Sequence, residues 1–176
     1  MREPTSSPEA KAFKQRHAGL PITLDLIDRR ESLFLNVNNR FDAEIDPALQ
    51  ENNVATTSSH LVTRLSHAVM RTIVNSSELA IPQIVEEWGS SARLLPRTVV
   101  LTHAPMDVIE ERILERQSAG MAGEALTGFN SLYFLAHYQD ALREAHSLLP
   151  SDISVFSYDS TKVTASEAAA RFMRTS

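Results

Sequence analysis

The sequence predicts an α/β protein in which a parallel sheet is flanked by helices and the first βα unit is missing. Two neighbouring patterns indicate this class. Residues Thr98–Thr102 are a short run rich in β-branched side chains, which is typical of a strand buried on both faces. After a break at His103–Pro105, apolar residues recur at helical spacing from Met106 to Gln117, with charged residues on the other face. A strand, a tight turn and a helix in succession make half of a βαβ unit.

The other elements follow from caps, apolar spacing and breakers. Thr5, Ser6 or Ser7 is expected to cap the first helix, with Pro8 in its first turn. Glycines 120, 123 and 128 predict an irregular loop after Gln117. Helices are expected over residues 9–17, 24–39, 60–74, 81–88, 130–149 and 166–173. The second of these is expected to continue to residue 45, with a break at Pro47. Further strands are expected over 54–57 and 153–157.

The composition restricts the function. The 176 residues are 43% apolar and 22% charged, as in a globular protein of one domain, here residues 1–176. A net charge of −5 argues against nonspecific nucleic-acid binding, which needs a basic surface. The lack of cysteine excludes disulfides, thiolate zinc sites and a cysteine nucleophile. No apolar run reaches membrane-spanning length, so no membrane partner is expected and the expected location is cytoplasmic.

The predicted strands are too few for the predicted helices. A doubly wound domain usually has more strands, and its first βα turn usually carries a phosphate-binding loop. Neither G-x-x-x-x-G-K-[ST] nor G-x-G-x-x-G occurs, because the five glycines stand at 19, 89, 120, 123 and 128. The sequence therefore indicates an α/β domain whose opening βα unit is absent.

Six segments stand in an informative order: Arg2-Glu-Pro4, Leu33–Arg40, Ile45–Leu49, Thr98–Gln117, Phe134–Leu142 and Ile153–Ser157. Taken together, they resemble segments of the thymidylate kinases, a family of P-loop nucleoside monophosphate kinases. The matching features of that family are R-E-P, a helix with an Asp-Arg pair, its I-x-P-A-L ending, L-D-x-x-P-E-x-x-x-x-R-x-x-x-R, the helix after the lid and the final strand. Residues 54–68 lie where the family has its strand into D-R-Y. The resemblance covers nearly the whole chain and implies a P-loop-kinase-like sheet.

The resemblance also implies a chemistry. Thymidylate kinases transfer phosphate from ATP to a nucleoside monophosphate, so dTMP is the favoured acceptor and Mg²⁺ and ATP are the implied cofactors. In that family the P-loop precedes R-E-P. Met1 is therefore expected to mark a natural deletion, a misplaced start codon or a trimmed chain. We expect the family activity if the native protein is complete, and no catalysis from these residues alone.

Two arginines are the candidate catalytic residues. Arg112 and Arg116 match the pair that leads into the family's lid, and their spacing of four places them on one helix face. The alternative is a solvated charged face in which Glu111 and Glu115 are their partners. No cluster of Asp, Glu and His at metal spacing is seen, and no metal ligand is predicted.

Three of the candidate nucleotide-binding residues are Arg2, Asn36 and Arg40. Arg40 matches a phosphate- or base-contacting arginine, and a guanidinium suits that role because it holds an oxyanion through two parallel bonds. The alternative for Arg40 is a solvated helix arginine. Asn36 stands where the family often has an aromatic that stacks on the base. Arg2 matches the R-E-P arginine, although a free chain start favours disorder.

The other three candidates are Ser58, Ser59 and His67. Ser58 and Ser59 replace the Asp and Arg of D-R-Y, and hydroxyls at a helix N-terminus either bind an anion or cap the helix. His67 aligns with a pocket position of the family. Its alternative is a surface or partly buried histidine without a ligand.

Two other functions stay open. A non-catalytic kinase relic would bind a nucleotide weakly or serve as a protein-interaction module. The sheet edge exposed by the missing strand favours pairing with another chain, for example in a homodimer. An unrelated helical α/β protein, in which the segment order is a coincidence, is the third hypothesis.

Overall fold

The computed structural model describes residues 7–17, 20–49, 60–91, 95–120, 129 and 131–175. Most of these residues are helical, and two strands form a small parallel sheet flanked by helices. The elements are, in order, α1 (Pro8–Arg16), α2 (Leu24–Leu49), α3 (His60–Asn75), α4 (Ile81–Ser91), β1 (Thr98–His103), α5 (Met106–Ser118), α6 (Leu132–Ser147), β2 (Ser154–Asp159) and α7 (Ala165–Thr175).

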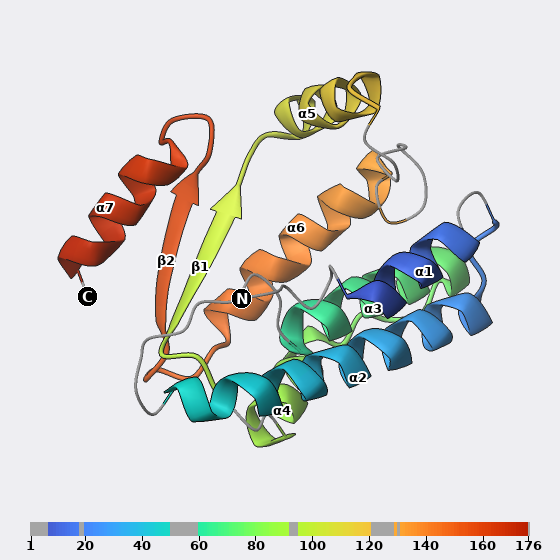
Figure 1. Cartoon of the computed structure of the whole chain (residues 1–176), viewed down its shortest axis with the longest axis horizontal. Coiled ribbons are helices and arrows are strands. Elements are labelled where there is room, and N and C mark those ends of the chain that lie inside the picture. The colour runs from blue at the N-terminus through green and yellow to red at the C-terminus, as the bar shows by residue number, and fades with distance from the viewer. Residues whose placement is uncertain are drawn as a thin grey trace.

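The sheet pairs β1 with β2 in parallel, from Thr98 opposite Ser154 to His103 opposite Asp159. Figure 1 shows both strands running toward the end of the molecule where α5 begins, with α7 beside β2. The chain between the strands contains α5 and α6. The α/β class is thus confirmed in its coarse form. The predicted strand at 54–57 lies outside the described residues.

The hydrophobic core lies mainly between helices. The helix α3 packs against α2, α4 and α6, as Figure 1 shows for the helical layer beside the sheet. Its residues Leu61, Leu65 and Val69 are buried because a spacing of four places them on one helix face. They pack with Ile27, Met70, Ile81, Val85, Trp88, Phe134, Ala141, Ala145 and Ile153. The sheet joins this core through Val99, which is partly buried against it.

Capping chemistry fixes several helix starts. The Ser7 Oγ accepts from the Ala10 N–H at 3.1 Å, which confirms a cap predicted for α1. The Ser131 Oγ accepts from the Phe134 N–H at 3.2 Å, so α6 begins at Leu132 and not at the predicted residue 130.

Several boundaries differ from the prediction. The helix α2 continues through Pro47 to Leu49, so the predicted break at Pro47 is wrong. A proline in a helix interior removes one backbone donor, and here the affected turn lies close to the helix end. His103 belongs to β1, and β2 is shifted toward Asp159, because the parallel pairing extends both strands together. In the described part of the chain, no helix is long and apolar enough to cross a membrane.

Candidate functional site

Arg112 lies at the carboxyl ends of the two strands. Its Nη1 donates to the Ser160 Oγ at 2.8 Å, and its Nη2 donates to the Ser160 carbonyl oxygen at 3.1 Å. The Ser160 N–H and Oγ–H both donate to the carbonyl oxygen of His103, at 2.9 and 3.2 Å. Arg112 therefore ties α5 to the turn after β2 and, through Ser160, to the end of β1. Arg116 lies one turn further along α5 and is exposed.

The turn after β2 is stabilised by its own polar contacts. The Asp159 Oδ1 accepts from the Thr161 hydroxyl at 2.7 Å and from the Thr161 N–H at 2.9 Å. These hydrogen bonds, first from the hydroxyl and then from the N–H, lower the pKa of Asp159. The Lys162 Nζ lies 3.5 Å from the other carboxylate oxygen. Open α/β sheets bind ligands at the carboxyl ends of their strands, so this turn and Arg112 occupy the place of a ligand site.

An open hollow on α5 has the wrong charge for a phosphate. It is lined by Asp107, Glu110, Glu111, Leu114, Glu115 and Ser118. Four carboxylates repel a phosphate group, and neither Arg112 nor Arg116 lines this hollow. An anionic ligand at the carboxyl ends must therefore approach from the Arg112 side of α5.

Asn36 and Arg40 share an exposed face of α2. The Arg40 Nη1 donates to the Glu9 Oε1 at 3.0 Å, and both side chains are about half exposed. The pKa of Glu9 is lowered, first by its own backbone N–H and then by Arg40. In the structure Arg40 thus connects α2 to α1, and its predicted role in nucleotide binding stays a prediction.

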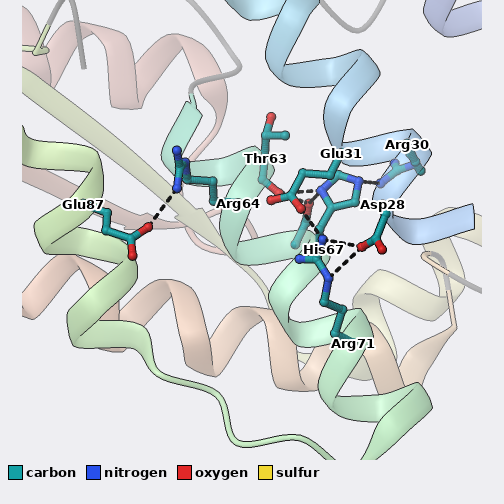
Figure 2. Close-up of polar contacts among 9 residues, drawn as sticks. Asp28, Arg30, Glu31, Thr63, Arg64, His67, Arg71 and Glu87 are labelled. Carbon is teal, nitrogen blue, oxygen red and sulfur yellow. Dashed lines mark hydrogen bonds and ion pairs between the residues drawn. The ribbon is translucent and has the colours of Figure 1, made fainter. Parts of the chain in front are cut away.

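His67 is buried in the interface between α2 and α3, with 1% of its surface exposed. Its Nδ1 donates to the Thr63 carbonyl oxygen at 2.6 Å, so Nδ1 carries the proton of the neutral ring. Its Nε2 therefore accepts from the Arg30 Nη1 at 2.9 Å (Figure 2). Burial, followed by the charge of Arg30, lowers the pKa of His67 to about 4. At neutral pH His67 is therefore an uncharged hydrogen-bond acceptor, whereas a side chain that binds phosphate would be a cationic donor.

Arg30 is surrounded by aromatic rings. Its guanidinium carbon lies 3.8 Å from the ring centre of Phe129 and 4.8 Å from that of Phe34. Phe129 contacts Phe134 edge to face, and Phe134 stacks on Tyr138. Burial lowers the pKa of Arg30 to about 10 and raises the pKa of Tyr138. We call Arg30, Phe34, His67, Phe129 and Tyr138 the Arg30 cluster.

The apolar spacing of α2 contains a sequence signal for Arg30, which is not among the predicted site residues. Ile27, Arg30, Phe34 and Val37 follow the i, i+3, i+7, i+10 spacing of one helix face, and the other three are buried. A charged residue in such an apolar stripe is exceptional, because burying a charge is costly without compensation.

Other polar pairs also cross the interface of α2 with α3. Arg71 donates to Asp28, with its Nη2 at 2.8 Å from Oδ1, and to Glu31 (Figure 2). Beyond them, the Asn38 Nδ2 donates to the Thr63 Oγ1 at 3.0 Å, and the His60 Nε2 lies 3.1 Å from the Asp42 Oδ2. On the far side of α3, Arg64 pairs with Glu87 of α4 at 3.0 Å. The interface of α2 with α3 is therefore fixed by a row of hydrogen bonds.

The described residues do not form a site that fits Mg²⁺ and ATP. Within that part of the chain, no group of three Asp, Glu or His side chains is placed to hold a metal ion. Asp159, the carboxylate at the end of β2, is engaged by Thr161 and Lys162. Mg²⁺ and ATP therefore remain implied only by the resemblance.

The predicted site residues fall into separate regions. Arg112 and Arg116 lie on α5, Asn36 and Arg40 on the exposed face of α2, and His67 in the buried interface. The described contacts of His67, Arg40 and Arg112 go to different partners, which are Arg30, Glu9 and Ser160. Arg2, Ser58 and Ser59 lie outside the described residues. No family model, curated protein or solved structure matches the chain.

Proposed function

We propose that the chain is a thymidylate-kinase-like module that binds a nucleoside monophosphate, with dTMP favoured, at the carboxyl ends of β1 and β2. The observation that carries the proposal is the double hydrogen bond from Arg112 to Ser160. It places a guanidinium beside the turn after the second of two adjacent parallel strands, where sheets of this class receive ligands.

Two further points support this assignment. The parallel β1, the helices α5 and α6, and the parallel β2 follow in the order expected for the second half of a P-loop-kinase-like sheet. A guanidinium is also the side chain best suited to a phosphate, because its planar fork donates two parallel hydrogen bonds. A dTMP phosphate would take the place of the Ser160 oxygens on Arg112 or add to them.

Phosphoryl transfer needs more than this site. Transfer from ATP requires a cradle of backbone N–H groups and a lysine, which the P-loop motif supplies. The 176 residues do not contain that motif, so we expect nucleotide binding without turnover from them.

Calorimetric titration with dTMP and with thymidine tests the proposal. We expect saturable binding of dTMP, weaker binding of thymidine, and a loss of at least about tenfold in dTMP affinity in Arg112→Gln, since charged hydrogen bonds contribute about 1.5–3 kcal/mol. Arg29→Gln is the matched control, because Arg29 is an exposed helix arginine paired only with the nearby Asp25 among described residues. Equal affinities in both variants, or no binding to the wild type, would refute the proposed site.

A second candidate function is protein–protein interaction, and one edge of β1, which is unpaired among the described strands, favours it. The Ser154 and Ser160 N–H groups donate to the carbonyl oxygens of Arg97 and His103, so Thr98, Val100 and Thr102 turn their backbone groups to the other edge of β1. No described strand pairs with that edge. Val100 and Val155 are 49% and 44% exposed, although strands of parallel sheets are normally covered.

Light scattering after size exclusion tests this second candidate. We expect a dimer of the wild type at micromolar concentration and a monomer of Val100→Lys, because a charge on an edge strand opposes pairing. Val74→Lys, which changes a similarly exposed residue at the end of α3, is the control. A wild type that stays monomeric at all concentrations would rule out a homodimer.

A further inference from the structure

The charge of Arg30 is not paired with a carboxylate of the described chain. Its hydrogen-bond partner there is His67, whose ring is neutral. The two carboxylates nearest along α2, Asp28 and Glu31, are both engaged by Arg71. Arg30 remains charged at neutral pH, because its pKa is about 10.

The aromatic rings around Arg30 compensate only part of the cost of shielding from water a charge that no described carboxylate pairs. Contacts with Phe129 and Phe34 stabilise the guanidinium through their ring faces, at 3.8 and 4.8 Å. A ring face accepts no in-plane hydrogen bond, whereas a guanidinium has five N–H donors in its plane. The structure shows one of these donors on the His67 Nε2. The rings also shield part of Arg30, which is partly buried, and the lower local dielectric strengthens any charge-assisted hydrogen bond that forms at the edge of the guanidinium.

We propose that Arg30 receives a small oxyanion, a phosphate or a carboxylate, at the interface between α2 and α3. Two parallel hydrogen bonds from the guanidinium edge would hold it, with Phe34 and Phe129 against the guanidinium. His67 fixes the orientation of Arg30 from the other side and is therefore a positioning residue. This site is separate from the one at the carboxyl ends of β1 and β2, and it does not depend on the proposed nucleotide binding.

Thermal unfolding of the whole chain in sodium phosphate, in sodium acetate and in sodium chloride of equal ionic strength tests the proposal. We expect a saturable rise in Tm with phosphate or with acetate and none with chloride. The anion that acts identifies the ligand class. Calorimetric titration of the same anion should show an affinity at least about tenfold lower in Arg30→Lys, which keeps the charge but loses the planar fork. Arg29→Lys on the same helix should retain the wild-type affinity.

Two outcomes overturn the proposal: no saturable effect of either anion on the wild type, or equal affinities in Arg30→Lys and the wild type. Arg30→Met is expected to abolish the effect, and if it does not fold, Arg30→Lys alone decides. The test separates the two sites: an anion effect that persists in Arg112→Gln and is lost in Arg30→Lys belongs to Arg30, whereas an effect lost only in Arg112→Gln belongs to the sheet site and overturns the proposal.

Discussion

Arg30 and His67 meet across the interface of α2 with α3, with the Arg30 Nη1 as donor and the His67 Nε2 as acceptor at 2.9 Å. This direction follows from the opposite ring nitrogen, whose proton is held by the Thr63 carbonyl oxygen. Protonation of His67 would replace the acceptor with a second cation next to Arg30. The contact therefore requires the neutral histidine.

The stability of the protein should depend on pH through His67. Its pKa is about 4 in the folded chain against 6.5 in the unfolded chain, so the unfolded chain binds a proton that the folded chain does not. The stabilisation is complete above pH 6.5 and is lost as the pH falls toward 4. The shift corresponds to a loss on the order of 3 kcal/mol in the free energy of unfolding.

Urea unfolding across this pH range gives the free energy of unfolding of the wild type and of His67→Gln. The carboxylates titrate in both proteins, so the difference between the two free energies isolates the contribution of His67. The introduced glutamine would keep an acceptor for Arg30 without titrating. His137→Gln, which changes an exposed histidine of α6, should retain the wild-type profile. Parallel profiles of the wild type and His67→Gln would contradict the prediction.

Arg112 and Ser160 should be coupled energetically. Their two hydrogen bonds join α5 to the turn after β2, so Arg112→Met and Ser160→Ala should each destabilise the fold. In a double-mutant cycle we expect a coupling of about 1 kcal/mol and faster amide exchange in residues 160–163 of both variants. Additive effects of the two changes would show that the contact contributes nothing in solution.

Arg71 should contribute more to the free energy of unfolding than an arginine in an exposed ion pair. It donates to both Asp28 and Glu31, and Glu31 is largely shielded from solvent. Arg71→Met should therefore cost about 1–2 kcal/mol, whereas an exposed pair such as Arg143 with Asp140 contributes about 0–1 kcal/mol. Chemical unfolding of Arg71→Met and Arg143→Met gives the comparison, and equal losses would count against the special role of Arg71.

The core around α3 should respond to a cavity. Leu65 is fully buried, so Leu65→Ala should reduce the free energy of unfolding by about 3 kcal/mol. Leu114→Ala removes the same atoms from an exposed position on α5 and should change it by less than about 0.5 kcal/mol. Similar losses in the two variants would place the core elsewhere.

Local signals predicted most of the elements that the structure describes. The cap at Ser7, the β-branched run at Thr98 and the apolar spacing after Met106 each depend on a few neighbouring residues. The predicted break at Pro47 is wrong because the continuity of a 26-residue amphipathic helix outweighs the local effect of one proline near its end.

The candidate sites were less predictable, because their partners are distant in the sequence. Arg30 and His67 lie on different helices, and Arg112 meets Ser160 only after β2 has paired with β1. The sequence alone does not decide whether His67 is a pocket residue or a surface or partly buried histidine. Its depth of burial and its tautomer follow from contacts that no local pattern contains.

The parallel pairing of β1 with β2 has a consequence for the order of folding. Thr98 cannot meet Ser154 until the chain containing α5 and α6 has closed a long loop, and this closure costs entropy before any sheet contact forms. Contacts between consecutive helices such as α3 and α4 need no such closure. The strand pair should therefore assemble late, and substitutions in β2 should accelerate unfolding far more than they slow refolding.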